Sequence, residues 1–204
     1  MVRDSIPYVI IPLLLALTVF ALGYWPGGVA LLMLTAFMAY FFRDPKRDVP
    51  PGDDIIVSPA DGKITRISQV SPGVEESPNV VSIFLSPLDV HINRSPIAGV
   101  ITEMSYMKGR FLMATNERAS LVNEQNSLTI QNQKVTVVCK QIAGVLARRI
   151  VCWKQKGDTV ELGERFGLIK FSSRTDLILP HTVKIEVREG MRVRGGATVI
   201  GRIV

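Results

Sequence analysis

The chain has 204 residues, enough for one domain with an appendage, and 47% of its residues are hydrophobic. Its formal net charge of +6 suits either an anionic lipid surface or a nucleic acid. Because no nucleic-acid-binding motif and no interleaved aromatic platform occurs, we expect no nucleic-acid partner.

The N-terminal region is far more apolar than the rest of the chain. Residues 6–24 are almost wholly apolar and carry no charge, and residues 29–42 form a second such run. A Trp-Pro-Gly-Gly turn signal at residues 25–28 separates the two runs. The first run approaches the roughly 20 residues that cross a bilayer core, while the second is shorter. We therefore predict that residues 1–42 form a hydrophobic helical hairpin that anchors the chain in a membrane, either spanning it or dipping into it.

A cleaved signal peptide and a buried soluble core are the competing interpretations of these runs. A signal peptide is disfavoured because a single Arg3 beside Asp4 makes a poor basic region, and no A-x-A-like cleavage site follows. Basic residues flank the hairpin on both sides, Arg3 before it and Arg43, Lys46 and Arg47 after it. Positive flanks favour the cytoplasmic side, which predicts a location on the cytoplasmic face of the cell membrane.

The rest of the chain reads as a linker followed by a β-rich domain. Residues 43–54 combine charge with Pro and Gly, and residues 55–204 consist of short β-type runs separated by Gly and Pro. The clearest strand predictions are residues 63–70, 80–85, 135–140, 145–153, 183–187 and 198–203. The fold class expected from this pattern is mainly β.

Two weaker features refine this prediction. A G-x-x-V-x-x-G pattern at residues 157–163 recurs at 190–196, as in the barrel-sandwich fold of biotinyl and lipoyl carrier domains. The lysine that carrier domains need is absent, so the likeness covers the fold and not the carrier function. Residues 111–126 are polar and long, which predicts a functional loop bordering a lipid-facing pocket.

We predict no catalytic, disulfide or metal-binding role for the two cysteines. Cys139 and Cys152 both lie in apolar runs and are too few for a disulfide framework or a metal site. We expect buried thiols in a reducing compartment, and we expect no metal.

Residues suited to proton transfer are few. His91 lies in a turn bounded by two prolines, close in sequence to Asp89, Asn93 and Arg94. His181 follows a proline in a loop, and a surface role is expected for it. Asp61, in Ser-Pro-Ala-Asp-Gly, is either an ordinary turn residue or a carboxylate that orients an imidazole.

The Ser172-Ser173 pair follows an apolar run and precedes an Arg-Thr-Asp sequence. Self-cleavage of a peptide requires a hydroxyl one bond after the scissile carbonyl, a base, and donors for the oxyanion. The Ser173 hydroxyl satisfies the first requirement toward the carbonyl of Ser172.

Taken together, these segments resemble phosphatidylserine decarboxylase in its short form, archaetidylserine decarboxylase-like relatives included. The resemblance rests on the apolar hairpin and on residues 58–62, 89–94, 141–151, 164–167 and 172–173. It implies a membrane enzyme that splits itself between Ser172 and Ser173 and converts Ser173 into a covalent pyruvoyl cofactor. It also implies that Asp61 and His91 support cleavage and decarboxylation, and that the two fragments remain together as a heterodimer.

The resemblance further implies a serine phospholipid as substrate and phosphatidylethanolamine and CO₂ as products. Basic residues would hold the lipid phosphate, and the candidates are Lys108, Arg110, Arg148 and Arg149. Ester-linked and ether-linked lipids, and a further homo-oligomer, stay open.

Two departures from the family pattern keep alternatives open. Ser172 stands where the family usually has Gly, and Arg94 stands where longer members carry a second His. The alternatives are an uncleaved, inactive relative and a non-catalytic, membrane-anchored adaptor of the lipoyl or biotinyl type.

Overall fold

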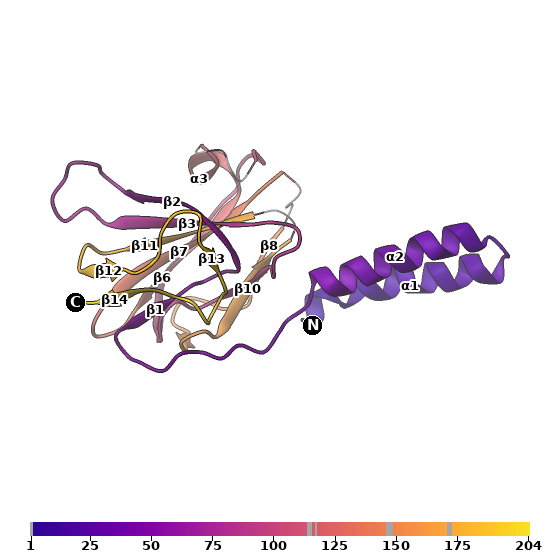
Figure 1. Ribbon diagram of the computed structural model, residues 1–204, viewed down its shortest axis with the longest axis horizontal. Helices are drawn as coiled ribbons and strands as arrows, with labels where there is room; N and C mark the ends of the chain where they lie inside the picture. The colour runs from indigo at the N-terminus through magenta and orange to yellow at the C-terminus, as the bar shows by residue number, and fades with distance from the viewer. Residues whose placement is uncertain (1, 114–115, 117, 146–148, 171–172) are drawn as a thin grey trace. The chain divides into compact units, whose positions relative to one another are not determined.

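The computed structural model describes residues 2–113, 116, 118–145, 149–170 and 173–204. The chain forms two compact units, Met1–Lys46 and Arg47–Val204 (Figure 1).

The first unit is a pair of apolar helices packed side by side (Figure 1). Its elements are a short 3-10 turn η1 (Arg3–Ser5), α1 (Ile6–Ala21) and α2 (Trp25–Phe41). Helix α1 stops before Gly23, whose φ of +78° is a left-handed conformation that glycine adopts without strain. A Cβ on Gly28 would lie 2.6 Å from the Phe20 ring, so glycine allows the helices to approach.

The predicted helical hairpin therefore forms. Helix α1 is shorter than the first apolar run, whereas α2 begins at Trp25 and so includes residues 25–28, where a turn was predicted. The two threonine hydroxyls of the hairpin are satisfied within the helices, because Thr18 and Thr35 each donate to the carbonyl four residues earlier. Many apolar side chains stay exposed, Leu14 at 57% and Met33 at 66% among them. Within the described residues, no helix has both the length and the apolar character needed to cross a membrane.

The second unit is mainly β, as the sequence predicts. Its described elements are β1 (Ile55–Val57), β2 (Gly62–Gln69), β3 (Asn79–Leu85), β4 (Ile92–Arg94), β5 (Gly99–Met107), α3 (Ala119–Val122), β6 (Gln125–Gln131), β7 (Thr136–Ala143), β8 (Ile150–Cys152), β9 (Thr159–Val160), β10 (Arg165–Ile169), β11 (Ser173–Leu179), β12 (Val183–Ile185), β13 (Arg192–Val193) and β14 (Val199–Ile203).

The described strands form one large antiparallel sheet and two small ones. The large sheet has the order β13-β2-β3-β11-β7-β6-β5-β9, and the small ones are β1-β14-β12 and β4-β10-β8. The inward faces of these sheets enclose a main apolar core that includes Ile64, Ile83, Leu128, Phe166 and Leu177. Strands β3, β7 and β11 lie at the centre of the large sheet.

The two halves of the β unit repeat the same local structure. Residues 58–64 (Ser-Pro-Ala-Asp-Gly-Lys-Ile) recur as residues 95–101 (Ser-Pro-Ile-Ala-Gly-Val-Ile). In both copies the serine hydroxyl donates to the carbonyl two residues later, at 2.7 Å for Ser58 and 2.6 Å for Ser95. The copies are therefore the same turn, with Asp61 in one and Ala98 at the matching position of the other.

The glycine repeat expected from the sequence belongs to this duplication. The amides of Gly157 and Gly190 donate to the carbonyls of Ile101 and Ile64 respectively, both at 2.8 Å. Each of the four repeat glycines, including Gly163 and Gly196, has a positive φ between +73° and +95°. These turns require glycine, which explains the regular spacing.

The predicted site residue Ser173 lies at one end of the large sheet. At this end β3 stops at Leu85, β5 stops at Met107, β6 begins at Gln125, β7 stops at Ala143 and β11 begins at Ser173. We call it the Ser173 end. The loop between β2 and β3 lies at the opposite end and projects to the left of the β unit in Figure 1.

Candidate active site

Ser173 is the first residue of a buried central strand. It pairs with Leu85 on β3 and with Ala143 on β7, and it is fully buried. Among the described residues, its Oγ has no hydrogen-bond partner. An unpartnered buried hydroxyl costs roughly 1–3 kcal/mol, so it calls for a functional explanation. A serine that is consumed in a reaction provides one.

His91 lies beside the strand that leads to Ser173. Its main-chain carbonyl accepts a hydrogen bond from the amide of Ile169 at 3.2 Å, and its side chain is only 3% exposed. The ring Nδ1 lies 2.9 Å from the carbonyl oxygen of Asp89. A carbonyl can only accept, so Nδ1 carries the hydrogen and Nε2 is the basic nitrogen of the neutral ring.

Asp61 has a different set of partners from those expected. Its two carboxylate oxygens accept hydrogen bonds from Nη2 of Arg47 at 2.8 and 2.7 Å. Oδ1 also accepts from the amide of Gly195 at 2.8 Å. The Asp89 carbonyl holds Nδ1 of His91, so an orienting role for Asp61 stays a prediction.

The duplicated turn makes Asp61 a functional candidate all the same. The matching turn at Ala98 forms without a carboxylate, so the turn itself does not need Asp61. The Arg47–Asp61 pair is largely buried, with side chains 9% and 14% exposed. Buried ion pairs are weak stabilising devices relative to apolar packing, so stability alone does not account for this one.

A buried chain of amide side chains connects β4, which directly follows His91, to β11, which begins at Ser173. Asn126 donates to Gln141 at 2.9 Å, Gln141 donates to Asn93 at 2.9 Å, and Asn93 donates to Thr175 at 3.0 Å. All four side chains are buried. Because Asn93 is on β4 and Thr175 on β11, this network fixes the two strands relative to each other. A fully satisfied buried network of this kind rigidifies its surroundings.

Gly167 completes the arrangement around this network. A Cβ at this position would lie 3.0 Å from the amide nitrogen of Gln141 and 2.3 Å from the carbonyl oxygen of Val151. Only glycine allows β10 to run this close to the Gln141 side chain.

On the other face of β11, Arg174 and Asp176 form a buried ion pair. The Arg174 Nε lies 2.6 Å from the Asp176 carboxylate, and Nη2 also donates to Ser82 at 2.9 Å. Residues 174 and 176 share a face because strand side chains alternate. The pair lies on the face opposite Ser173 and braces β11 against β3.

The proposed phosphate-binding residues are distributed unevenly. Lys108, Arg110 and Arg149 are exposed on loops at the Ser173 end. Arg148 and Ser172 lie outside the described residues. His181 is exposed just beyond the far end of β11, and that end lies about 20 Å from Ser173 at the usual rise per strand residue. This position suits the surface role expected for His181.

Both cysteines are free thiols. Burial raises the pKa of the Cys139 thiol far above its usual range, and the nearby charge of Asp176 raises this pKa further. Burial also raises the pKa of the half-buried Cys152. Raised pKa values leave little thiolate, so neither group is a reactive nucleophile.

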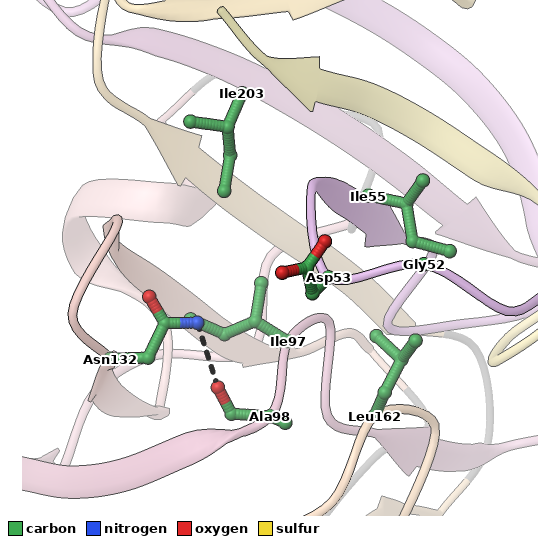
Figure 2. Close-up of a pocket in the computed structure, with 8 residues that line it drawn as sticks. All are labelled: Gly52, Asp53, Ile55, Ile97, Ala98, Asn132, Leu162 and Ile203. Carbon is green, nitrogen blue, oxygen red and sulfur yellow. Dashed lines mark hydrogen bonds between the residues drawn. The ribbon is translucent and has the colours of Figure 1, made fainter.

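A small pocket lies away from this site (Figure 2). It has a volume of about 80 Å³ and is lined by Gly52, Asp53, Ile55, Ile97, Ala98, Asn132, Leu162 and Ile203. Asn132 follows β6 at the end opposite Gln125, so the pocket lies on the far side of the sheet from the Ser173 end. It holds a few water molecules at most, and none of the predicted site residues lines it.

Comparison with known proteins gives one consistent result. The family model described as phosphatidylserine decarboxylase matches residues 34–201. Three similar relatives each bear the name phosphatidylserine decarboxylase proenzyme. The relative from Pelodictyon phaeoclathratiforme is 47% identical over 86% of this chain and 81% of its own length. The relative from Symbiobacterium thermophilum is 44% identical, over 98% and 94% respectively. The relative from Wolbachia sp. subsp. Brugia malayi is 41% identical, over 98% and 90%.

A family of decarboxylases made as proenzymes agrees with a buried serine, without a partner among the described residues, at the start of a central strand. The chain belongs to the phosphatidylserine decarboxylase family. The resemblance drawn from the sequence is thereby confirmed.

Proposed function

We propose that this chain splits its own backbone between Ser172 and Ser173 and then decarboxylates phosphatidylserine, or a related serine phospholipid, to the ethanolamine lipid and CO₂. One observation carries the proposal above all: the buried Ser173 hydroxyl, without a partner among the described residues, at the start of β11. Membership in a family whose relatives are named proenzymes supports it.

Self-cleavage follows from the position of this hydroxyl. Oγ of Ser173 attacks the carbonyl carbon of Ser172, and the amide becomes an ester. Loss of the Cα proton of Ser173 then expels the Ser172 carboxylate and leaves a dehydroalanine. One water molecule replaces the dehydroalanine nitrogen, which departs as ammonia, and residue 173 becomes a pyruvoyl group.

His91 is our candidate base for both stages. Nε2 is its basic nitrogen because Nδ1 is held by the Asp89 carbonyl. In the first stage this nitrogen takes the proton from Oγ of Ser173. In the second stage the imidazolium returns a proton to the lipid carbon that has lost its carboxylate.

The pyruvoyl group fits the position of Ser173. A carbonyl there takes the place of a buried hydroxyl that lacks a partner among the described residues. When present, such a group supplies an electron sink of the kind that pyridoxal provides. The chain's own contribution is to bury the reacting atoms and to fix β4, which directly follows His91, against β11 through the amide network.

We assign a supporting role to Asp61 and the exposed basic residues. Asp61 lies two strands from Ser173, because it precedes β2, which pairs with β3, the neighbour of β11. Its carboxylate is paired with Arg47, so any effect of its negative charge on the site is offset by that guanidinium. Lys108, Arg110 and Arg149, with Arg148, are the candidates for holding the lipid phosphate.

We further propose the following organisation. Residues 1–42 anchor the chain in the cell membrane on its cytoplasmic face, residues 43–54 are a linker, and residues 55–204 form the catalytic domain with a barrel-sandwich architecture. The exposed apolar side chains of the helices support membrane contact, because such patches mark interaction surfaces. The fragments 1–172 and 173–204 would stay together as a heterodimer.

The test is a Ser173→Ala variant of the full chain. Without the hydroxyl, neither splitting nor release of CO₂ from phosphatidylserine vesicles should occur, while circular dichroism matches that of the parent. A Ser120→Ala variant, on helix α3, serves as the matched control and should split normally. Full activity in folded Ser173→Ala would disprove the assignment, and a parent that stays whole and inactive would favour the adaptor or the inactive relative.

A further inference from the structure

Exposed apolar side chains gather on the loops that leave the Ser173 end of the sheet. Leu88 follows β3, Phe111 and Met113 follow β5, Leu121 lies in α3 and Val145 follows β7. Their exposed fractions range from 39% for Phe111 to 73% for Leu121. Single exposed apolar residues are normal, but five on the loops of one sheet end need an explanation.

The loop that carries three of these residues is fixed to the sheet. The side-chain amide of Asn123 donates to the carbonyl of Ala143 at 2.7 Å and to that of Leu112 at 2.9 Å. Its Oδ1 accepts from the amide of Leu112 at 2.9 Å, and the amide of Arg110 donates to Val122 at 2.6 Å. The apolar side chains are therefore held outward by a braced backbone.

Among the described residues of these loops, the exposed charges are all positive. Within the described parts of these loops, the exposed charged side chains are Lys108, Arg110, Arg118 and Arg149. The acidic side chains there are less accessible: Glu124 is buried, and Asp89 is half-buried and paired with Arg192. Apolar side chains interspersed with basic ones suit the boundary between headgroups and acyl chains in an anionic bilayer.

We propose that Leu88, Phe111, Met113, Leu121 and Val145, with the four basic residues around them, form a lipid-docking rim. The rim belongs to the catalytic unit itself and adds a membrane contact to that of the helical hairpin. It presses the Ser173 end of the sheet onto an anionic bilayer, so that a lipid reaches the buried site without crossing water. The proposal rests on the proposed function, because a lipid substrate gives this end of the sheet a reason to meet a bilayer.

The test places a tryptophan on the rim of the full-length chain. Leu121→Trp and Met113→Trp are read by quenching with vesicles of phosphatidylcholine and phosphatidylglycerol whose acyl chains are brominated. Val74→Trp is the matched control, since Val74 is 56% exposed on the β2–β3 loop at the opposite end. The signal of Trp25 and Trp153 is subtracted with the parent protein.

We expect the fluorescence of a tryptophan at position 121 or 113 to be quenched several-fold more strongly than that of one at position 74. The emission at positions 121 and 113 should also shift to shorter wavelength. The difference should shrink in high salt or without phosphatidylglycerol, because each basic residue near an anionic surface strengthens binding roughly fivefold. Equal quenching at all three positions, or quenching that ignores lipid charge, would overturn the proposal. So would a blue shift that appears without vesicles and grows with protein concentration, which would assign the rim to a second copy or another protein.

The same samples separate this inference from the proposed function. Mass analysis reports whether each protein is split at residue 173. A split protein without rim quenching refutes the rim alone. An unsplit protein with rim quenching refutes the enzyme assignment and leaves the membrane contact standing.

Discussion

At the residue scale, the two histidines have separate environments. His91 is buried, with its ring tautomer set by the Asp89 carbonyl, and its main chain is bonded to Ile169. His181 is exposed at the opposite end of β11. The exposure of His181 suits the surface role expected for it, whereas the catalytic role of His91 stays a prediction.

Replacing His91 should therefore slow self-cleavage while replacing His181 should not. Positioned general-base help is worth roughly 10²–10⁴ in rate, so His91→Ala should accumulate uncut chain and His181→Ala should split like the parent. A time course of fragment appearance, with circular dichroism as the fold control, measures this. Normal splitting by folded His91→Ala would remove His91 as the processing base.

The partners of Asp61 could not be predicted from the sequence. Arg47 was assigned to the flank of the apolar hairpin, and nothing in its local pattern indicates a contact with a turn 14 residues later. The duplicated Ser-Pro-x-x-Gly sequence could have indicated a special role for Asp61, because the second copy has an alanine at the matching position.

The Arg47–Asp61 pair should be sensitive to loss of one partner. Arg47→Gln leaves a largely buried carboxylate with the Gly195 amide as its remaining partner, and breaking such a pair costs roughly 3–5 kcal/mol in the free energy of unfolding. Arg202→Gln, at an exposed pair with Asp54 and Glu186, should have no measurable effect. Urea unfolding followed by circular dichroism compares them. Equal stability of the two variants would mean that the buried pair contributes nothing.

At the element scale, β11 is among the strands that were not predicted from the sequence, together with the long strands β5 and β6. Its first four residues, Ser173, Arg174, Thr175 and Asp176, are polar, yet all are buried. Their polarity is satisfied across strands, Thr175 through the Asn93 amide and Arg174 through Asp176 and Ser82. Polar residues are normally expected to be exposed, so the sequence pattern does not reveal that the start of β11 is a buried strand. Strands β2, β3 and β14, with alternating or apolar patterns, were predicted to within about one residue.

The core strand β7 carries a pH-sensitive group. Burial raises the pKa of the Cys139 thiol, whereas the unfolded thiol has a pKa of about 8.5. Below pH ~8.5 the thiol is protonated in both the folded and the unfolded chain, so it causes no pH dependence of stability. Above pH ~8.5 only the unfolded chain releases this proton, and the free energy of unfolding falls by about 1.4 kcal/mol per pH unit.

The free energy of unfolding should fall between mildly and strongly alkaline pH. Urea titrations on either side of pH ~8.5 measure the fall, and Cys139→Ala should show a smaller one. An identical pH dependence in the parent and the variant would show that the thiol does not contribute.

At the scale of the whole molecule, the split would pass through an interlocked sheet. The fragment 173–204 supplies β11 between β3 and β7, β13 beside β2, and β14 beside β1. These partners all belong to the other fragment, so the two cannot separate without unfolding the sheet. The mainly β architecture and the family were accessible from the sequence. This interleaving was not, because it depends on long-range strand pairing.

The central claim is that the chain makes its own catalytic group from Ser173, and an intact mass spectrum tests it most directly. The purified protein should contain fragments 1–172 and 173–204 whose summed mass equals that of the whole chain plus one water minus one ammonia, and they should co-elute until denatured. Fragments that sum to the whole chain plus one water, with a free amine on Ser173, would indicate simple proteolysis. That result, or a fully active protein that is wholly unsplit, would contradict the account.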